Sequence, residues 1–438
     1  KLSLKKSILA IDKAEENVKQ AKGNLTPSLS ADVQTKWLSD NLVEAFLGRE
    51  GSTTITGSLN LQQVIFSEPV LTNIAINKLI QENTTEQNRQ TILDDVVTIA
   101  QTYISVLLAK TNLTLQNENL NVTKANLSVA ENKDKLGLSK QSDVNRWISE
   151  LNMNKIQLSN ALANYKKAVY TLNETLNQDI SIEYNFPESI DIDEALNFPE
   201  ELIIPYIKDE YLIEILADFY LKEMQSYSPE LMRVLISEQI IDRQIKSNKR
   251  QYVLPDVVGF ANASDVFLRE GNYTDPNLPV PPLPNDLTWN AGIGLSLPIF
   301  DRRTRSTNLQ KSIIDKEIIQ YSKQEIENAL ERNIRTQVHQ FKASYVSNDF
   351  ALKASEAADK NFSQVEDAYK QGFITVTQLL EAQSSKFNAN LLAVQTNYKV
   401  VLDYLILERL TGKIQLLDTE TQQKEYLIRL QQHLITRE

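Results

Sequence analysis

The chain has 438 residues, a formal net charge of −11 at pH 7 and no cysteine. The acidic balance argues against nucleic-acid binding, because no basic face is available to neutralise phosphates, and the lack of cysteine excludes disulfides, cysteine-ligated zinc and cysteine nucleophiles. Hydrophobic residues make up 42% of the chain and glycine only 11 positions, which favours a folded protein with long helices.

An amphipathic helix opens the chain. Its apolar residues recur at the spacing of a helical stripe: Leu4, Ile8, Ile11, Val18 and Ala21. Gly23 and Pro27 end the helix.

Two strands follow the first helix. Between Ser28 and Trp37, apolar and polar residues alternate strictly, with Leu29, Ala31, Val33, Thr35 and Trp37 on one face. This period of two is typical of a strand. A loop with Gly48 and Gly51 precedes a second alternating strand over Thr54–Gln62.

A very long helix comes next. Ser67-Glu68-Pro69 predicts its start, since proline is tolerated in a first helical turn. The helical pattern continues from Val70 to Leu136, which is about 100 Å at 1.5 Å per residue. Gly137 ends it, and we expect a second helix over Gln141–Leu176 to return antiparallel.

The chain repeats this series of elements, so its architecture is a tandem duplication. Residues at the ends of the predicted elements match between the two copies: Pro27 with Pro255, Ile65-Phe66 with Ile299-Phe300, and Gly137 with Gly372. We expect a first repeat over residues 1–176, a linker over 177–228, a second repeat over 229–412 and a tail over 413–438.

The second repeat has the same predicted elements in the same order. These are a helix over Leu231–Lys249, strands over Asp256–Phe267 and Leu287–Leu297, a long helix from about Asp301 to Tyr369, and a return helix over Thr375–Leu410. The acidic linker holds three prolines and apolar runs such as Tyr211–Tyr220, which favour short helices. The proline-dense segment 275–284 can form neither helix nor strand and predicts an exposed loop.

These elements indicate a tube that crosses a membrane on strands. A helix of about 100 Å needs lateral partners in water, and the opening and return helices, laid end to end, match its length. No run of eighteen apolar residues is present, so we expect no transmembrane helix.

Strands of about ten residues can cross an outer membrane when tilted. Four strands cannot close a barrel, and an open edge is not tolerated in lipid. Three copies would supply twelve strands, with Trp37 and Trp289 as membrane-interface aromatics. Two soluble hairpins with one buried face explain the alternation equally well.

The chain resembles the TolC-like outer membrane efflux protein family over nearly its whole length. The matching pieces are Gly23-Asn24-Leu25-Thr26-Pro27-Ser28-Leu29, Leu295-Ser296-Leu297-Pro298-Ile299-Phe300-Asp301, Ala368-Tyr369-Lys370-Gln371-Gly372 with Thr377-Gln378-Leu379-Leu380-Glu381-Ala382-Gln383, and Arg409-Leu410-Thr411-Gly412. The resemblance implies a mainly α fold, in which a homotrimer forms a twelve-stranded outer membrane β-barrel and a periplasmic α-barrel.

The resemblance also implies a function. Such proteins are exit ducts that dock a periplasmic adaptor and an inner membrane transporter, with the linker and the tail forming a belt around the tube. They extend from the outer membrane of Gram-negative bacteria into the periplasm.

Site residues follow from the resemblance as expectations. The helical turns would be periplasmic tips that contact the adaptor: Gly137, Leu138, Ser139, Gly372, Phe373, Ile374 and Thr375. Asp143 matches an acid that narrows the tube, and Tyr369 matches a gate tyrosine. Gln378 and Glu381 stand where the family often has two aspartates, so the ring carries less charge. Three copies of Asp143 and Glu381 in a narrow lumen would attract cations, whereas solvated acids at a helix end are the ordinary alternative.

No other chemistry is indicated. His339 and His433 are far apart and lack a ligand-spaced cluster around them, so we expect no metal site and no cofactor. Neither a phosphate loop nor a nucleophile elbow is present, and we expect no enzyme. A soluble coiled-coil scaffold is the alternative function, but it has no need of ten-residue amphipathic strands.

Overall fold

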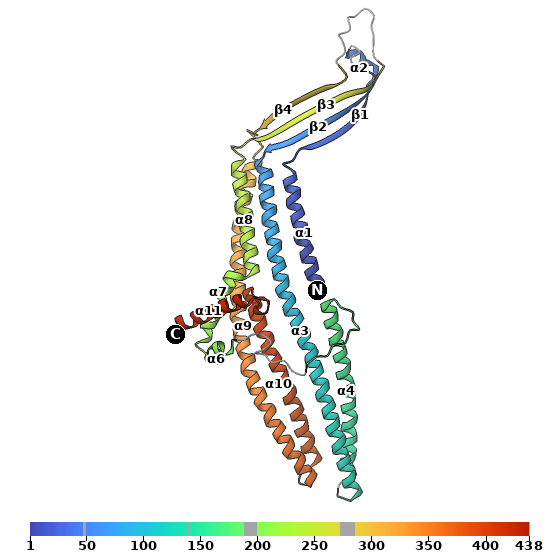
Figure 1. The fold of residues 1–438 in the computed structure, drawn as a ribbon, viewed down its shortest axis with the longest axis vertical. Helices are drawn as coiled ribbons and strands as arrows, with labels where there is room; N and C mark the ends of the chain where they lie inside the picture. Colours follow the sequence, from blue (N-terminus) through green and yellow to red (C-terminus); the bar gives the residue numbers. More distant parts are fainter. Residues whose placement is uncertain (47–49, 139, 188–198, 272–284, 438) are drawn as a thin grey trace, which may run out of the picture. The chain divides into compact units, whose positions relative to one another are not determined.

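The computed structural model describes residues 1–46, 50–138, 140–187, 199–271 and 285–437 (Figure 1). The proline-dense segment 275–284 and Ser139 lie outside these residues. The chain divides into two compact units. The helical unit contains Lys1–Ile8, Glu86–Met232 and Gln324–Glu438, and the sheet unit contains Leu9–Thr85 and Arg233–Lys323.

The sheet unit holds four antiparallel strands in the order β1-β2-β3-β4, side by side in Figure 1. Their bounds are Ser28–Trp37 for β1, Thr53–Phe66 for β2, Asp256–Glu270 for β3 and Thr288–Ser296 for β4. The prediction for β1 is confirmed at both ends, and β2 and β3 extend further than expected. Because β2 pairs with β3, the two repeats share one sheet.

The register of the sheet separates an apolar face from a polar face. Leu29 lies opposite Leu61, and Ala263 lies opposite both Leu59 and Trp289. The other face is polar, with Asn262 opposite Asn60 and Asn290. Large apolar side chains remain exposed on this sheet, so within the described residues nothing covers its apolar face.

A short helix in the β1–β2 connection was not predicted. It is α2, Asp40–Ala45, and its Val43 is buried. The sequence around it has no helical stripe long enough to be recognised, which is why it was interpreted as loop.

One helix precedes the first strand of each repeat. These helices are α1, Leu2–Gly23, and α8, Pro229–Arg250. The helices that follow the strands are α3, Glu68–Lys135, and α9, Thr304–Gln371, each 68 residues long. In the sheet unit, Arg243 of α8 pairs with buried Glu68 of α3 at 2.7 Å, and Asn248 donates a hydrogen bond to Ser312 of α9 at 2.9 Å.

The helical unit contains two helical hairpins. Helix α3 turns into α4, Gln141–Leu176, and α9 turns into α10, Val376–Thr411. Both return helices begin and end within one residue of the predicted positions.

Shorter helices of the helical unit come from the linker and the tail. They are α6, Glu200–Lys208, α7, Ile213–Tyr227, the 3₁₀ turn η1, Gln415–Leu417, and α11, Glu420–Arg437. Arg429 of α11 donates two hydrogen bonds to Glu223 of α7, at 2.9 and 2.8 Å. The linker and the tail thus pack together, and the predicted short helices are present.

Helix α3 qualifies the expectation about transmembrane helices. It contains an 18-residue window with a mean hydropathy of 1.5, long and apolar enough to cross a membrane by composition. Core helices pass the same test, and α3 buries Ile104, Val106 and Leu107 against the rest of the helical unit. Polar residues interrupt the apolar ones in this window, so a search for eighteen consecutive apolar residues does not find it.

Candidate functional site

The two hairpin turns have the same backbone structure. Gly137 and Gly372 adopt φ values of 73° and 87°, the left-handed region that favours glycine. In each turn the glycine N–H donates to the residue three positions back, at 2.9 and 3.0 Å. The next residue, Leu138 or Phe373, donates to the residue five positions back. This pair of bonds is the Schellman ending of a helix.

The turns present large apolar side chains to solvent. Leu138 is 74% exposed and Phe373 is 78% exposed. Ile374 instead packs against the buried cluster behind the turn. A single exposed apolar side chain is ordinary on a protein surface, and here one is repeated at both turns.

Thr375 and Gln378 form a capping box at the start of α10. The N–H and hydroxyl of Thr375 donate to Gln378 Oε1 at 2.9 and 3.0 Å, and the Gln378 N–H donates back to Thr375 Oγ1 at 3.4 Å. The side chain of Gln378 is therefore engaged in capping the start of α10. Lys140 at the start of α4 makes no such side-chain cap.

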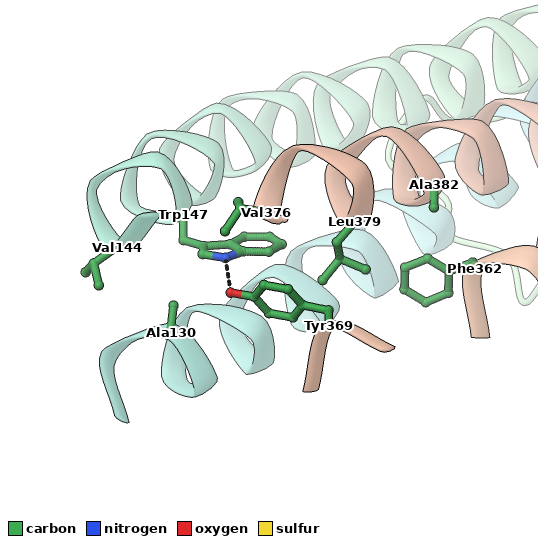
Figure 2. Packing of buried hydrophobic residues seen from close by; sticks show 8 residues of the cluster. All are labelled: Ala130, Val144, Trp147, Phe362, Tyr369, Val376, Leu379 and Ala382. Atoms are coloured by element: carbon green, nitrogen blue, oxygen red, sulfur yellow. Dashed lines mark hydrogen bonds between the residues drawn. The ribbon is translucent and has the colours of Figure 1, made fainter. Parts of the chain in front are cut away.

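A buried cluster joins the two hairpins immediately behind the turns (Figure 2). It consists of Ala130, Val144, Trp147, Phe362, Tyr369, Val376, Leu379 and Ala382, contributed by α3, α4, α9 and α10. Trp147 Nε1 donates a hydrogen bond to Tyr369 Oη at 3.1 Å, and the two rings lie 6.2 Å apart at 59°. The predicted gate tyrosine thus binds the opposite hairpin.

Charged groups surround Tyr369. Lys133 Nζ lies 4.6 Å from the ring centroid and donates to the Tyr369 carbonyl oxygen at 2.6 Å. Burial raises the pKa of the Tyr369 hydroxyl, the carboxylate of Asp143 raises it further, and the hydrogen bond from Trp147 lowers it. Asp143, in the first turn of α4, is close enough to act on Tyr369 electrostatically.

The structure does not bring all the predicted gate residues together. Asp143 is half-buried beside Tyr369, whereas Glu381 is exposed on α10, one turn beyond the capping residue Gln378. Arg146 provides a further link between the hairpins, because its Nη1 donates to Thr377 Oγ1 at 3.0 Å.

A buried polar network lies further along the same helices. Gln383 of α10 donates to Thr123 of α3 at 2.9 Å, and Asn154 of α4 donates to the same hydroxyl at 2.8 Å. Asn119 donates to Asn154 Oδ1 at 3.3 Å. Polar groups buried between helices favour one register over others, since a shift would leave them unpaired.

Three residues of this site were not predicted from the sequence. Trp147, Lys133 and Arg146 hold the hairpins together, yet each sits in an ordinary helical pattern. Trp147 is one of only three tryptophans in the chain, and that rarity is the one signal that the sequence offered.

The predicted interface tryptophans are both on edge strands. Trp37 ends β1 and Trp289 lies in β4, and they are 73% and 77% exposed. Both side chains belong to the apolar face of the sheet, since Trp289 lies opposite Ala263 and Trp37 continues the alternation from Leu29.

The fold matches solved channel structures. Over 94% of this chain and 89% of the other, it superposes on the channel-forming protein CusC with a TM-score of 0.73 at 13% identity. It superposes on the CmeC outer membrane channel of Campylobacter jejuni over 98% of this chain and 87% of the other, with a TM-score of 0.68 at 16% identity. It superposes on the outer membrane protein VceC of Vibrio cholerae over 94% of this chain and 93% of the other, with a TM-score of 0.69 at 14% identity.

Sequence comparison identifies the family. A search among curated proteins found no match, but the family model for outer membrane efflux proteins matches residues 1–178 and 284–413. These segments cover the first repeat and most of the second, and they omit most of the linker, α8, the third strand and the tail. The chain therefore belongs to the outer membrane efflux protein family.

Proposed function

We propose that three copies of this chain form an exit duct, which carries substrates from a periplasmic adaptor and an inner membrane transporter to the cell exterior. The protein is an outer membrane efflux channel by family. Beyond the family assignment, we propose that the chain assembles as a homotrimer and that it binds an adaptor and a transporter. The duct itself is passive and performs no enzymatic reaction.

The four-stranded sheet carries the trimer proposal. Its strands have one apolar and one polar face, and β1 and β4 each leave one edge unpaired within the described residues. Lipid can contact the apolar face only if both edges are paired. Three sheets joined edge to edge give twelve strands and a closed barrel with a polar interior.

Mass and conductance measurements test this proposal. Purified full-length protein in mild detergent is expected to have three times the mass of the chain after correction for bound detergent. It is also expected to open pores in a planar bilayer. A monomer that does not partition with outer membranes would overturn the proposal.

The hairpin tips support an adaptor contact. Leu138 and Phe373 are exposed at two turns of the same backbone structure, so the trimer would present six similar tips. We expect Leu138→Asp with Phe373→Asp to abolish adaptor binding and efflux while the trimer stays intact. Tyr211→Asp is a matched control, because Tyr211 is equally exposed but lies between α6 and α7. Unchanged adaptor binding would contradict the assignment of the tips.

The buried cluster behind the tips supports a gate. Trp147, Tyr369 and Lys133 tie the two hairpins together, with Asp143 beside them. We infer that separating the hairpins at this point opens the duct, and that Asp143 and Glu381 line the passage.

A further inference from the structure

The junction between β4 and α9 is exposed and its backbone is strained. Ile299 and Phe300 are 96% and 83% exposed. Arg302 and Arg303, which follow them, adopt left-handed φ values of 55° and 69°. A residue with a Cβ is strained in that region, so the surroundings must hold the backbone in place.

Arg305 holds this turn from within. Its Nε and backbone N–H donate to Asp301 Oδ2 at 2.8 and 2.9 Å, and its guanidinium also donates to the carbonyls of Pro298 and Gln251 at 2.5 and 3.0 Å. The turn is therefore fixed by Arg305. Arg302 and Arg303 are left exposed at its outer side, and no ion pair is found for either among the described residues.

The equivalent junction in the first repeat is covered at the start of α3, although Ile65, the counterpart of Ile299, is 53% exposed. There, Glu68 at the start of α3 is 2% exposed and pairs with Arg243 of α8 at 2.7 Å. Helix α8 leads into β3, and β3 pairs with β2, the strand that precedes α3. Where the second repeat meets the first, the pairing of β3 with β2 thus occurs together with a contact between α8 and α3.

The duplication assigns counterparts to Glu68. Alignment of Phe66 with Phe300 matches Glu68 with Arg302. Alignment of Gly137 with Gly372 matches Glu68 with Arg303. Either alignment replaces the acid by an arginine.

Arg243 has counterparts of the opposite charge as well. Helices α1 and α8 are both 22 residues long, and alignment of their bounds matches Arg243 with Glu16. Alignment of Pro27 with Pro255 matches it with Glu15. The Arg243–Glu68 pairing therefore recurs in the sequence with its charges exchanged, whereas Arg250, which lies 3.5 Å from Glu68, has no acidic counterpart.

We propose that the β4–α9 junction of one copy docks on α1 of a second copy, where Arg302 and Arg303 pair with Glu15 and Glu16. The inference rests on the proposed trimer and deepens it to named residues. Just as α8 accompanies β3 onto β2 and α3, helix α1 of the second copy accompanies its β1 onto β4 and α9. Because the charges are exchanged, the acidic start of α3 attracts α8, which carries Arg243, and the basic start of α9 attracts α1, which carries Glu15 and Glu16.

Apolar residues on both helices agree with this contact. Leu9, seven residues before Glu16 on the same helical face, is 64% exposed. Ile314 and Ile318 of α9 are 47% and 56% exposed. With the bounds of α1 and α8 aligned, Leu9 corresponds to Ile236, and with Gly137 aligned to Gly372, Ile314 corresponds to Leu79; both counterparts are half-buried.

Lys19 is the group that Arg302 and Arg303 must displace. Its Nζ lies 3.1 Å from Glu15 and 2.9 Å from Glu16, and the lysine side chain is 58% exposed. Exposed ion pairs of this kind contribute little to stability. Glu15 and Glu16 can therefore exchange Lys19 for Arg302 and Arg303 when the apolar residues of α1 and α9 come into contact.

Charge reversal and its rescue test the proposal in full-length protein in mild detergent. The first variant is Arg302→Glu with Arg303→Glu, the second is Glu15→Arg with Glu16→Arg, and the third combines all four changes. Oligomer mass is measured over a temperature series, and circular dichroism checks that each variant has folded. We expect each double variant to lose at least half of its trimer where the wild type keeps its own, and the combined variant to regain it.

Three outcomes would overturn this assignment. The first is a double variant that stays as trimeric as the wild type, and the second is a combined variant that shows no recovery. The third is a trimeric Arg302→Glu, Arg303→Glu variant that no longer binds phosphatidylglycerol vesicles, which would make the junction a lipid headgroup site. A wild-type protein that is itself monomeric would overturn the proposed trimer as well.

Discussion

Trp147 of α4 and Tyr369 of α9 are both buried and share a 3.1 Å hydrogen bond from the indole Nε1 to the phenol oxygen. Because one residue comes from each hairpin, this bond joins the two repeats immediately behind the tips. Tyr369 also accepts a hydrogen bond from Lys133 through its backbone carbonyl. Any movement that separates the hairpins must break these contacts.

Tyr369→Phe is expected to loosen the tips. The change leaves the buried indole N–H without an acceptor, at a cost of about 1–3 kcal/mol. We expect a lower midpoint of thermal unfolding and more frequent openings in a planar bilayer. Tyr170→Phe is the control, because Tyr170 is 48% exposed on α4. Equal effects of the two changes would rule out a special role for the Trp147 contact.

Asp143→Ala with Glu381→Ala is expected to reduce cation preference. Removing the carboxylates from a narrow passage lowers its attraction for cations. The reversal potential in a KCl gradient should therefore move toward the value of a non-selective pore. Glu131→Ala removes an exposed acid near the same tip and serves as the control. An unchanged reversal potential in the double variant would remove both acids from the passage.

Gly372→Ala is expected to destabilise the second hairpin. A φ of 87° costs a residue with a Cβ roughly 1–2 kcal/mol, although no neighbouring atom of the described residues lies within 4 Å of the added carbon. Gly23→Ala is the matched control, because Gly23 also ends a helix with open space around it but lacks a positive φ. The midpoint of thermal unfolding should fall for the first variant and stay the same or rise for the second. Equal midpoints would contradict the strain argument.

Glu408→Gln is expected to change how stability depends on pH. Burial of Glu408 in α10 raises the pKa of its carboxyl from 4.5 to about 8, although hydrogen bonds from Gln415 and Tyr404 lower it. Between these values the folded chain holds a proton that the unfolded chain has released. Raising the pH therefore disfavours folding, by up to about 1.4 kcal/mol per pH unit for one proton.

The variant should consequently gain stability over the wild type as pH rises from about 5 to about 8. Above that range the difference should stay constant, because both states of the wild type are then ionised. Chemical unfolding in detergent at several pH values measures the difference. Glu420→Gln, an exposed acid at the start of α11, is the control. A difference that does not vary with pH would contradict the protonated state of Glu408.

Local sequence patterns predicted the elements well where physical periodicity is strong. The strict alternation of Ser28–Trp37 predicted β1 at both ends, and glycine in the left-handed region marked both turns. The short helix α2 was missed, because six residues carry too little periodicity. The helical stripe of α1 was only partly confirmed, since Ala14, Val18 and Ala21 are buried while Ile8 stays exposed.

The sequence by itself determined the duplicated order of helices and strands, the apolar and polar faces of the strands, and the two glycine turns. Each of these depends on residues close together in the chain, where spacing alone decides which side chains share a face. Only the tertiary structure brought Trp147 to Tyr369 and Arg243 to Glu68, because those partners lie in different repeats and no local pattern records which helices will be neighbours.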